Sequence, residues 1–160
     1  MKYRILTYQE LQILQEDFSE FLYKRGLNKF EWNVLQDQES NNAFRILSSF
    51  SDETFEKVLK DIKFLEFRSK NRIQSIKCQA KKMVILKLTS KLNQAIDFTD
   101  RNCIRSLEKE SLVPYSCSKE VKYYEQEREK EIFSLIESGC YSVNSSLFIS
   151  LNTSRKAIQN

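Results

Sequence analysis

One stretch of the sequence carries the side chains best suited to bind a polyanion. Between residues 68 and 91 there are eight basic residues and no Asp or Glu. They are Arg68, Lys70, Arg72, Lys77, Lys81, Lys82, Lys87 and Lys91. Basic side chains that follow a phosphate backbone gain affinity by releasing its counterions. This basic segment therefore predicts a candidate nucleic-acid interface.

Two other properties of the basic segment favour different interpretations. Six of its eight basic residues are lysines, and it contains no aromatic side chain on which a base could stack. Single-strand binders and RNA-recognition sheets depend on such stacking. Lysines also protect hairpin edges from pairing with other chains. A solvated edge, or a contact with an acidic protein, stays open beside the nucleic-acid interpretation.

A second candidate is an arginine on the apolar stripe of a helix predicted at 119–138. Tyr124, Arg128 and Ile132 follow one another at spacings of four, so the guanidinium should face the core. A buried cation needs a paired anion. The sequence leaves two interpretations open. One is a structural ion pair with Glu66 or another carboxylate, and the other is an anion or partner pocket that contains Arg128 and Tyr124.

The composition argues against the usual catalytic machinery. With no His and only two Gly, the chain offers no imidazole base and no glycine-rich loop for a phosphate. Its cysteines include no close pair of the kind that binds zinc. They are Cys78, Cys103, Cys117 and Cys140. Asp97 and Asp100 could ligate Mg²⁺, but Thr99 or Asp100 is more typical of a helix N-cap. We predict no catalytic residue, no metal and no cofactor.

The apolar periodicity predicts an α+β fold that is mostly helical and forms a single domain over residues 1–160. A β-hairpin at 73–89 is the centre of a small antiparallel sheet, since its apolar residues alternate or form a short β-branched run. Further strand candidates are 96–98 and 112–115, the second confined to a sheet edge by Pro114. The predicted helices are about 7–25, 29–37, 41–50, 52–67, 100–110, 119–138 and 146–157.

Local signals mark several helix ends. Two pairs of residues predict capping boxes, Thr7 with Glu10 and Asn28 with Glu31. Ser51, followed by two acidic residues, predicts the N-terminus of the helix at 52–67. Gly26 and Gly139 predict helix C-termini, because glycine adopts the left-handed conformation at least cost.

Three motifs resemble those of a known group of proteins. They are Met1-Lys2-Tyr3-Arg4-x-Leu6-Thr7, Phe64-Leu65-Glu66-x-Arg68-Ser69, and Arg128-x-x-Glu131-Ile132-Phe133-x-Leu135-Ile136-Glu137-x-Gly139. On these motifs the chain resembles a family of small uncharacterised proteins from Bacteroidetes, over Met1 to about Leu151. The resemblance implies a bacterial cytoplasmic setting and no particular activity.

These observations favour a non-enzymatic intracellular interaction or accessory domain, with a protein partner or a second copy of itself. The alternative is a nucleic-acid-binding protein that uses residues 68–91. We expect no contact with a membrane and a cytoplasmic location, because no run approaches the roughly 20 apolar residues that span a bilayer. The C-terminal helix, with Leu147, Phe148 and Leu151, should dock either on the protein's own core or in a partner's groove.

Overall fold

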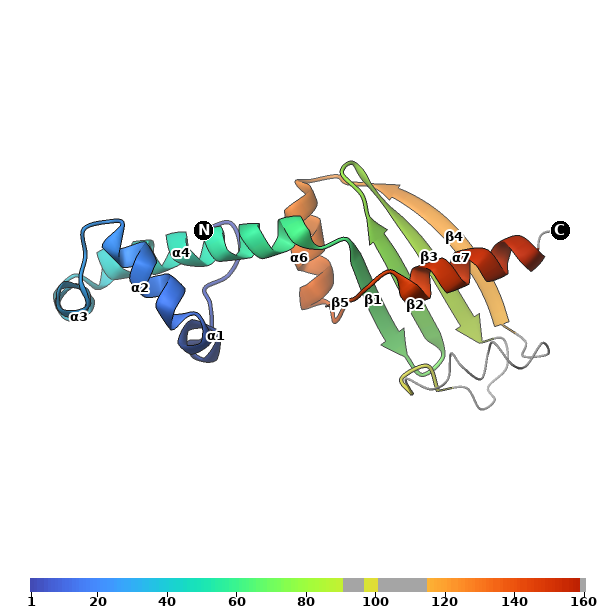
Figure 1. Cartoon of the computed structure of the whole chain (residues 1–160), viewed down its shortest axis with the longest axis horizontal. Helices are drawn as coiled ribbons and strands as arrows, with labels where there is room; N and C mark the ends of the chain where they lie inside the picture. Colours follow the sequence, from blue (N-terminus) through green and yellow to red (C-terminus); the bar gives the residue numbers. More distant parts are fainter. Residues whose placement is uncertain (91–96, 101–114, 159–160) are drawn as a thin grey trace. The chain divides into compact units, whose positions relative to one another are not determined.

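The computed structural model describes residues 1–90, 97–100 and 115–158 (Figure 1). Helices and an antiparallel sheet together confirm the α+β class predicted from the sequence. The chain divides into two compact units, Met1–Lys60 and Asp61–Asn160. The first unit is helical, and the second is built on the sheet. The single domain expected over residues 1–160 stays a prediction.

The helical unit begins with two short helices where the sequence predicted one. Its helices are α1 (Tyr8–Ile13), α2 (Gln15–Tyr23), α3 (Lys29–Gln38) and α4 (Ser40–Asp61). The predicted helix 7–25 is interrupted at Leu14, where ψ is +20°. Neither glycine nor proline marks this break. The helix expected at 29–37 is confirmed as α3.

The helix ends follow the predicted local chemistry. The Thr7 hydroxyl accepts a hydrogen bond from the Glu10 N–H at 3.2 Å, and the Glu10 carboxylate accepts one from the Thr7 N–H at 2.7 Å. Asn28 and Glu31 form a second capping box before α3. Gly26 has φ +74°, which lets the Leu27 N–H reach back to the Leu22 carbonyl at 3.0 Å.

Helix α4 is continuous, so the prediction of two helices at 41–50 and 52–67 is wrong. Ser51 resembles an N-cap in the sequence, but its hydroxyl donates to the Leu47 carbonyl at 2.8 Å and accepts from the Leu6 N–H at 3.1 Å. The Asp52 carboxylate accepts the N–H of Tyr3 at 2.9 Å. These polar side chains bind the N-terminal segment rather than starting a helix.

An aromatic cluster forms the core of the helical unit. The Phe18 ring meets the Trp32 ring edge-on, with centroids 5.2 Å apart, and lies 4.9 Å from the Phe50 ring. The buried members of the cluster are Leu6, Phe18, Phe21, Leu22, Trp32, Ala43 and Phe50. Burial of large rings from α2, α3 and α4 stabilises the packing of these helices.

The second unit is a five-stranded antiparallel sheet with two described helices. Its strands are β1 (Phe64–Ser69), β2 (Arg72–Cys78), β3 (Lys82–Ser90), β4 (Tyr115–Tyr123) and β5 (Tyr141–Ser142). Its helices are α6 (Arg128–Glu137) and α7 (Ser146–Ile158). The strand order is β4-β3-β2-β1-β5. The predicted hairpin at 73–89 is confirmed as β2 and β3.

Two strands occupy positions predicted to be helical. Residues 64–69 form β1, which pairs with β2 along its whole length, and residues 115–123 form the edge strand β4 beside β3. The prediction of a helix over 119–138 is therefore correct only from Arg128 onward. Spacings of three and four between Val121, Tyr124 and Arg128 suggest a helix, but pairing with β3 satisfies the backbone of this segment instead.

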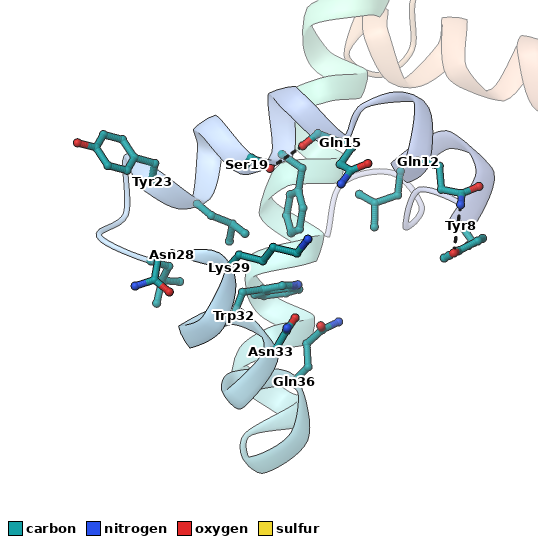
Figure 2. A pocket seen from close by; sticks show the side chains of 14 residues that line it. Tyr8, Gln12, Gln15, Ser19, Tyr23, Asn28, Lys29, Trp32, Asn33 and Gln36 are labelled. Atoms are coloured by element: carbon teal, nitrogen blue, oxygen red, sulfur yellow. Dashed lines mark hydrogen bonds between the residues drawn. The ribbon is translucent and has the colours of Figure 1, made fainter.

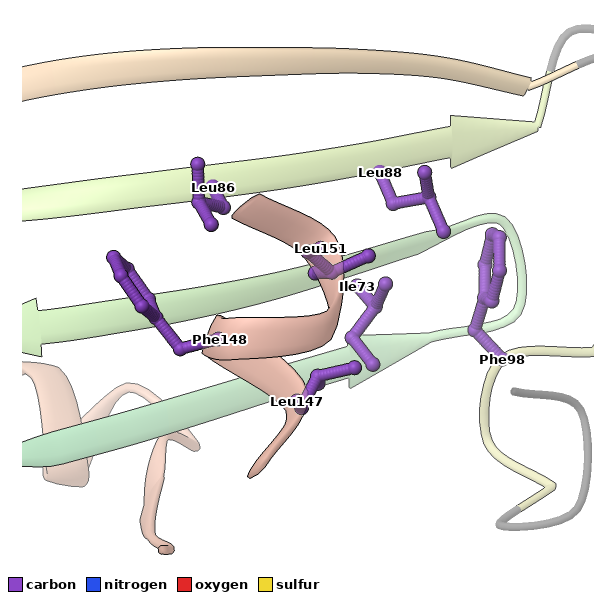
Figure 3. Close-up of a cluster of buried hydrophobic side chains, with 7 residues drawn as sticks. All are labelled: Ile73, Leu86, Leu88, Phe98, Leu147, Phe148 and Leu151. Atoms are coloured by element: carbon purple, nitrogen blue, oxygen red, sulfur yellow. The ribbon is translucent and has the colours of Figure 1, made fainter. Parts of the chain in front are cut away.

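The C-terminal helix α7 docks on the protein's own sheet. Of the two alternatives that the sequence left open, docking on the protein's own core is the one found. Leu147, Phe148 and Leu151 pack against buried residues of the central strands (Figure 3). Those buried residues are Ile73, Leu86 and Leu88, joined by Phe98. The Phe148 ring also lies 5.7 Å from the Phe64 ring.

Several predictions fall outside the described residues. The helix expected at 100–110 lies there except for residue 100, and so do Cys103, Lys91 and Pro114. Residues 97–100, which include the last two residues of the first strand candidate (96–98), form a turn instead of a strand. The Asp97 carboxylate accepts the Thr99 N–H at 2.9 Å. Tyr115, the end of the second candidate, begins β4, which is an edge strand as expected.

Candidate functional site

A groove of about 660 Å³ lies wholly within the helical unit, between α1, α2 and α3 (Figure 2). Its volume is within the roughly 300–1,000 Å³ of typical ligand sites. It is lined by Tyr8, Leu11, Gln12, Gln15, Phe18, Ser19, Leu22, Tyr23, Leu27, Asn28, Lys29, Trp32, Asn33 and Gln36. We refer to these residues as the helical groove.

Apolar side chains form one part of this lining, and the turn between α2 and α3 positions them. The left-handed Gly26 ends α2 and brings Leu27 back against its last turn. The Asn28 side chain then accepts the N–H groups of Phe30 and Glu31, at 2.9 and 3.0 Å, and starts α3. The two helices that this turn joins place Trp32 against Phe18. Much of the apolar lining is therefore shared with the core.

The polar part of the lining consists mainly of uncharged side chains. Five of the residues are amides, namely Gln12, Gln15, Asn28, Asn33 and Gln36. Tyr8 and Tyr23, the two tyrosines of the lining, are 75% and 80% exposed. Neutral amides donate and accept hydrogen bonds without the desolvation cost of an ion. Such a surface suits an occupant that buries apolar groups and is polar at its margins.

Lys29 is the one charged residue in the lining. It lies in the first turn of α3, and its side chain makes no hydrogen bond or ion pair with any residue that the structure describes. The Trp32 indole N–H also has no hydrogen-bond partner among those residues. Because Lys29 and Trp32 are three residues apart on α3, both lie on the same face of the helix. In Figure 2 the Lys29 side chain extends over the groove beside Trp32.

Arg128 and Tyr124, the sequence candidates for an anion pocket, converge instead on backbone carbonyls. The Tyr124 hydroxyl donates to the Gln79 carbonyl at 3.1 Å, and the Arg128 Nε donates to the same oxygen at 3.2 Å. The Arg128 guanidinium also donates to the carbonyl of Ile62. These contacts join the start of α6 to the ends of β1 and β2.

The carboxylate partner of Arg128 is its chain neighbour. The guanidinium lies 3.0 Å from a Glu129 carboxylate oxygen. The sequence left the partner open between Glu66 and another carboxylate; Glu129 is found, while Glu66 pairs with Arg68 two residues away on β1 and accepts the Tyr141 hydroxyl at 2.7 Å. A carboxylate partner was expected and is found. The Arg128 guanidinium therefore binds groups of the protein itself, and these contacts connect α6 to the segments beside β1 and β2.

Burial governs the titration of the groups around Arg128. It raises the pKa of the Cys78 thiol to about 11, against a smaller opposing effect of the Arg128 charge. Burial, together with the nearby Cys78 thiol, raises the pKa of Tyr124 to about 12. Both groups are neutral at pH 7. Neither is poised to act as a nucleophile or base there.

The basic segment is spread over two faces of the sheet and two turns. Lys77 lies opposite Val84 and therefore on the face that α7 covers, as do Lys82 and Arg68. Lys87 lies opposite Gln74 and Ser118, on the other face, which Arg72 shares. Lys70 and Lys81 lie in the turns at opposite ends of β2.

Two members of the segment are also paired with carboxylates. Lys87 forms an ion pair with Glu120 on β4, and Arg68 with Glu66. Arg72 lies over the Phe67 ring at 5.4 Å, and Lys82 over the Tyr123 ring at 5.8 Å. Eight neighbouring cations in the sequence therefore do not share one face of the sheet.

The comparisons with known proteins give a family and no activity. A family model described as a family of unknown function, DUF6495, matches residues 1–156. The chain belongs to the DUF6495 family. The resemblance to uncharacterised proteins is thereby confirmed, and the Bacteroidetes origin stays a prediction. The comparisons of the DUF6495 chain with curated proteins and with solved structures gave no match.

Sequence reasoning about the DUF6495 chain did not identify the helical groove. Trp32 and Lys29 both fall within the helix predicted at 29–37, and no spacing in that helix points to a binding site. The signal that could have found them is a capped helix start that combines a lysine and the only tryptophan with a neighbouring run of amides. In the part of the chain that the structure describes, no three His, Cys, Asp or Glu side chains lie close enough to hold a metal ion.

Proposed function

We propose that this chain is a non-catalytic interaction or accessory domain whose binding surface is the helical groove. The single observation that carries the proposal is the groove itself, with its apolar side chains, its amides and a Lys29 that is unpaired among the described residues. Interfaces combine an apolar centre with a polar rim in this way. The partner is a protein, either a different chain or a second copy.

The exposed aromatic side chains of the helical unit support a protein partner. Tyr8, Tyr23 and Phe30 are 74–80% exposed, and Ile13 is 84% exposed. Tyrosine and phenylalanine are enriched at interfaces, because their rings bury much apolar surface with little loss of conformational entropy. Two of these residues, Tyr8 and Tyr23, line the groove. A partner that occupies the groove can therefore cover both rings.

Nucleic-acid binding through residues 68–91 receives less support. Its basic side chains point to both faces of the sheet, and Lys87 and Arg68 are neutralised by carboxylates. Counterion release requires several cations along one phosphate backbone. The described arrangement offers only small groups of such cations on each face.

A cytoplasmic location in a bacterium belongs to the same proposal. Cys78, Cys117 and Cys140 are all free thiols, which is typical of reducing compartments. Among the residues described, every helix is too short or too polar to span a bilayer.

Site-specific photo-crosslinking tests the interaction function. A photoreactive benzoylphenylalanine replaces Ser19, which lines the groove, in the full chain expressed in its native cells. The matched control carries the same residue at Glu16, which is exposed on α2 but outside the lining. We expect ultraviolet light to produce a discrete protein adduct from position 19 and none from position 16.

The pattern of adducts decides the proposal. A defined adduct from position 19 alone supports the groove as the interaction surface, and its mass distinguishes a second copy from another protein. Equal labelling from both positions indicates non-specific contact and contradicts the proposal. Absence of any adduct from position 19 contradicts it as well.

A further inference from the structure

We propose that the helical groove binds an amphipathic α-helix of the partner protein, which presents an apolar face and a carboxylate that pairs with Lys29. This inference rests on the proposed function and names the chemistry of the partner. It commits to a helix with an acidic residue beside its apolar stripe.

Charge complementarity at Lys29 argues for the carboxylate. Lys29 is the only charged residue of the lining and has no ion-pair partner in the described residues. It lies in the first turn of α3, where the partial positive charge of the helix terminus adds to its own. The indole N–H of Trp32, which also has no partner in the described part of the chain, is a further donor on the same face of α3. An anionic group of the partner can use both donors.

The walls of the groove argue for a helix over an extended peptide. All of the lining belongs to α1, α2, α3 and the turn between the last two. Backbone groups within helices are already paired, so these walls offer no strand edge for an extended peptide. A helix satisfies its own backbone and needs only side-chain contacts. The amides of Asn33 and Gln36 make no described hydrogen bond and can contact polar residues that flank its apolar face.

The length of α2, which forms one wall of the groove, fits a short partner helix. Helix α2 has nine residues, which corresponds to about 13 Å along its axis. Apolar side chains at positions i, i+4 and i+7 of a partner helix span about 10 Å. The apolar residues of the lining that such anchors can contact are Phe18 and Leu22 of α2, with Leu11, Leu27 and Trp32 beside them.

Helix α7 of a second copy does not meet these requirements. Its sequence, from Ser146 to Ile158, contains no acidic residue to face Lys29. Its apolar residues Leu147, Phe148 and Leu151 are buried in its own unit. The occupant is therefore a different helix.

A displayed peptide library tests the inference directly. The probe is a library of 14-residue helical peptides without Trp, in which seven positions on one face and its flanks are randomised. Selection uses the full chain and, in parallel, the Lys29→Glu variant. Position 29 is exposed in the first turn of α3, where an acidic residue is favoured, so the variant should fold. Its circular dichroism spectrum checks this.

Binding of the selected peptides is measured by the emission of Trp32, the only tryptophan of the chain. We expect peptides selected on the natural chain to share a three-residue apolar stripe with Asp or Glu beside it. Replacing that acid by Lys should weaken binding about tenfold, and Lys29→Glu should reverse the preference. Ser19→Arg, which fills the groove, should abolish the emission change, and the matched Glu16→Arg should not.

Failure of this inference is distinguishable from failure of the proposed function. A specific adduct from position 19, together with selected peptides that lack an acid or do not respond to Lys29→Glu, overturns the partner chemistry and leaves the interaction function standing. Selected peptides that bind equally well to Ser19→Arg overturn the groove as their site. If no helical peptide is selected at all, the inference is wrong.

Discussion

The Asp52 carboxylate on α4 accepts a hydrogen bond from the backbone N–H of Tyr3 at 2.9 Å. The same carboxylate accepts the N–H of Lys2, at 2.8 Å to one oxygen and 2.7 Å to the other. The Tyr3 hydroxyl donates to Glu56, one helical turn further on, at 2.8 Å. The first residues of the chain are thus held along α4 by two acidic side chains of that helix.

Removing the Asp52 carboxylate should destabilise the helical unit. In Asp52→Ala, the N–H groups of Lys2 and Tyr3 lose a charged acceptor, and we expect a loss of about 1–2 kcal/mol in the free energy of unfolding. Urea denaturation followed by Trp32 fluorescence measures it. Asp17→Ala, at an exposed position of α2, is the control and should change stability by less than about 0.5 kcal/mol. Equal midpoints for the two variants would contradict the role of Asp52.

The capping box of α1 should make the free energy of unfolding depend on pH in the acidic range. The Arg4 guanidinium and the Thr7 backbone hold the pKa of Glu10 down to about 2. Because this pKa is below that of the unfolded chain, about 4.3, Glu10 stabilises the folded state above that value. The contribution declines as the pH falls from about 4.3 toward 2.

The comparison of the natural chain with Glu10→Gln isolates this effect. The natural chain should be the more stable of the two at pH 6, and the difference should shrink steadily as the pH is lowered to 3. Urea midpoints at each pH give the measurement. A difference that stays constant over this range would show that the charge of Glu10 does not contribute.

Arg128 should stabilise the sheet unit without binding an anion. Arg128→Met keeps much of the side-chain volume but removes the donors to Gln79, Ile62 and Glu129, with an expected loss of about 3 kcal/mol. Arg128→Lys should recover little, because an ammonium lacks the planar fork of the guanidinium. Thermal denaturation measures both variants. Stabilisation of the natural chain by millimolar phosphate that Arg128→Met abolishes would revive the pocket interpretation.

Leu151 should anchor α7 on the sheet. The side chain is 8% exposed and packs within the cluster of Ile73, Leu86 and Phe98. Leu151→Ala should cost about 3 kcal/mol and raise the rate of amide hydrogen exchange in α7. The control is Ile149→Ala on the same helix, where the side chain is 58% exposed, and it should leave exchange unchanged. Similar exchange in both variants would count against the anchoring role.

Local chemistry explains why some elements could be predicted from the sequence. The capping boxes at Thr7 and Asn28 involve residues only three apart, so their spacing is sufficient evidence. Gly26 and Gly139 both have positive φ, as predicted for helix ends. The β2–β3 hairpin joins residues close in the chain and shows an apolar run too short for a helix.

Other elements depend on partners that are distant in the sequence. The pairing of Val84 with Val121 brings together residues from separate segments, and no local pattern favours β4 over a helix. Ser51 resembles a helix cap in the sequence, but its hydroxyl accepts the N–H of Leu6. Leu6 lies 45 residues earlier, so no local sequence pattern can reveal this hydrogen bond. The helical groove arises from three helices packing around Trp32, so its lining could not be derived from spacing alone.

The strand order β4-β3-β2-β1-β5 has a consequence for how the sheet assembles. Strands β1, β2 and β3 follow one another in the chain through two short turns, so their pairing closes small loops at little entropic cost. The β5 strand, in contrast, pairs Tyr141 with Glu66 and closes a loop of some 75 residues with only two residues of ladder. This topology favours early formation of the central meander during refolding, with the C-terminal segment adding last.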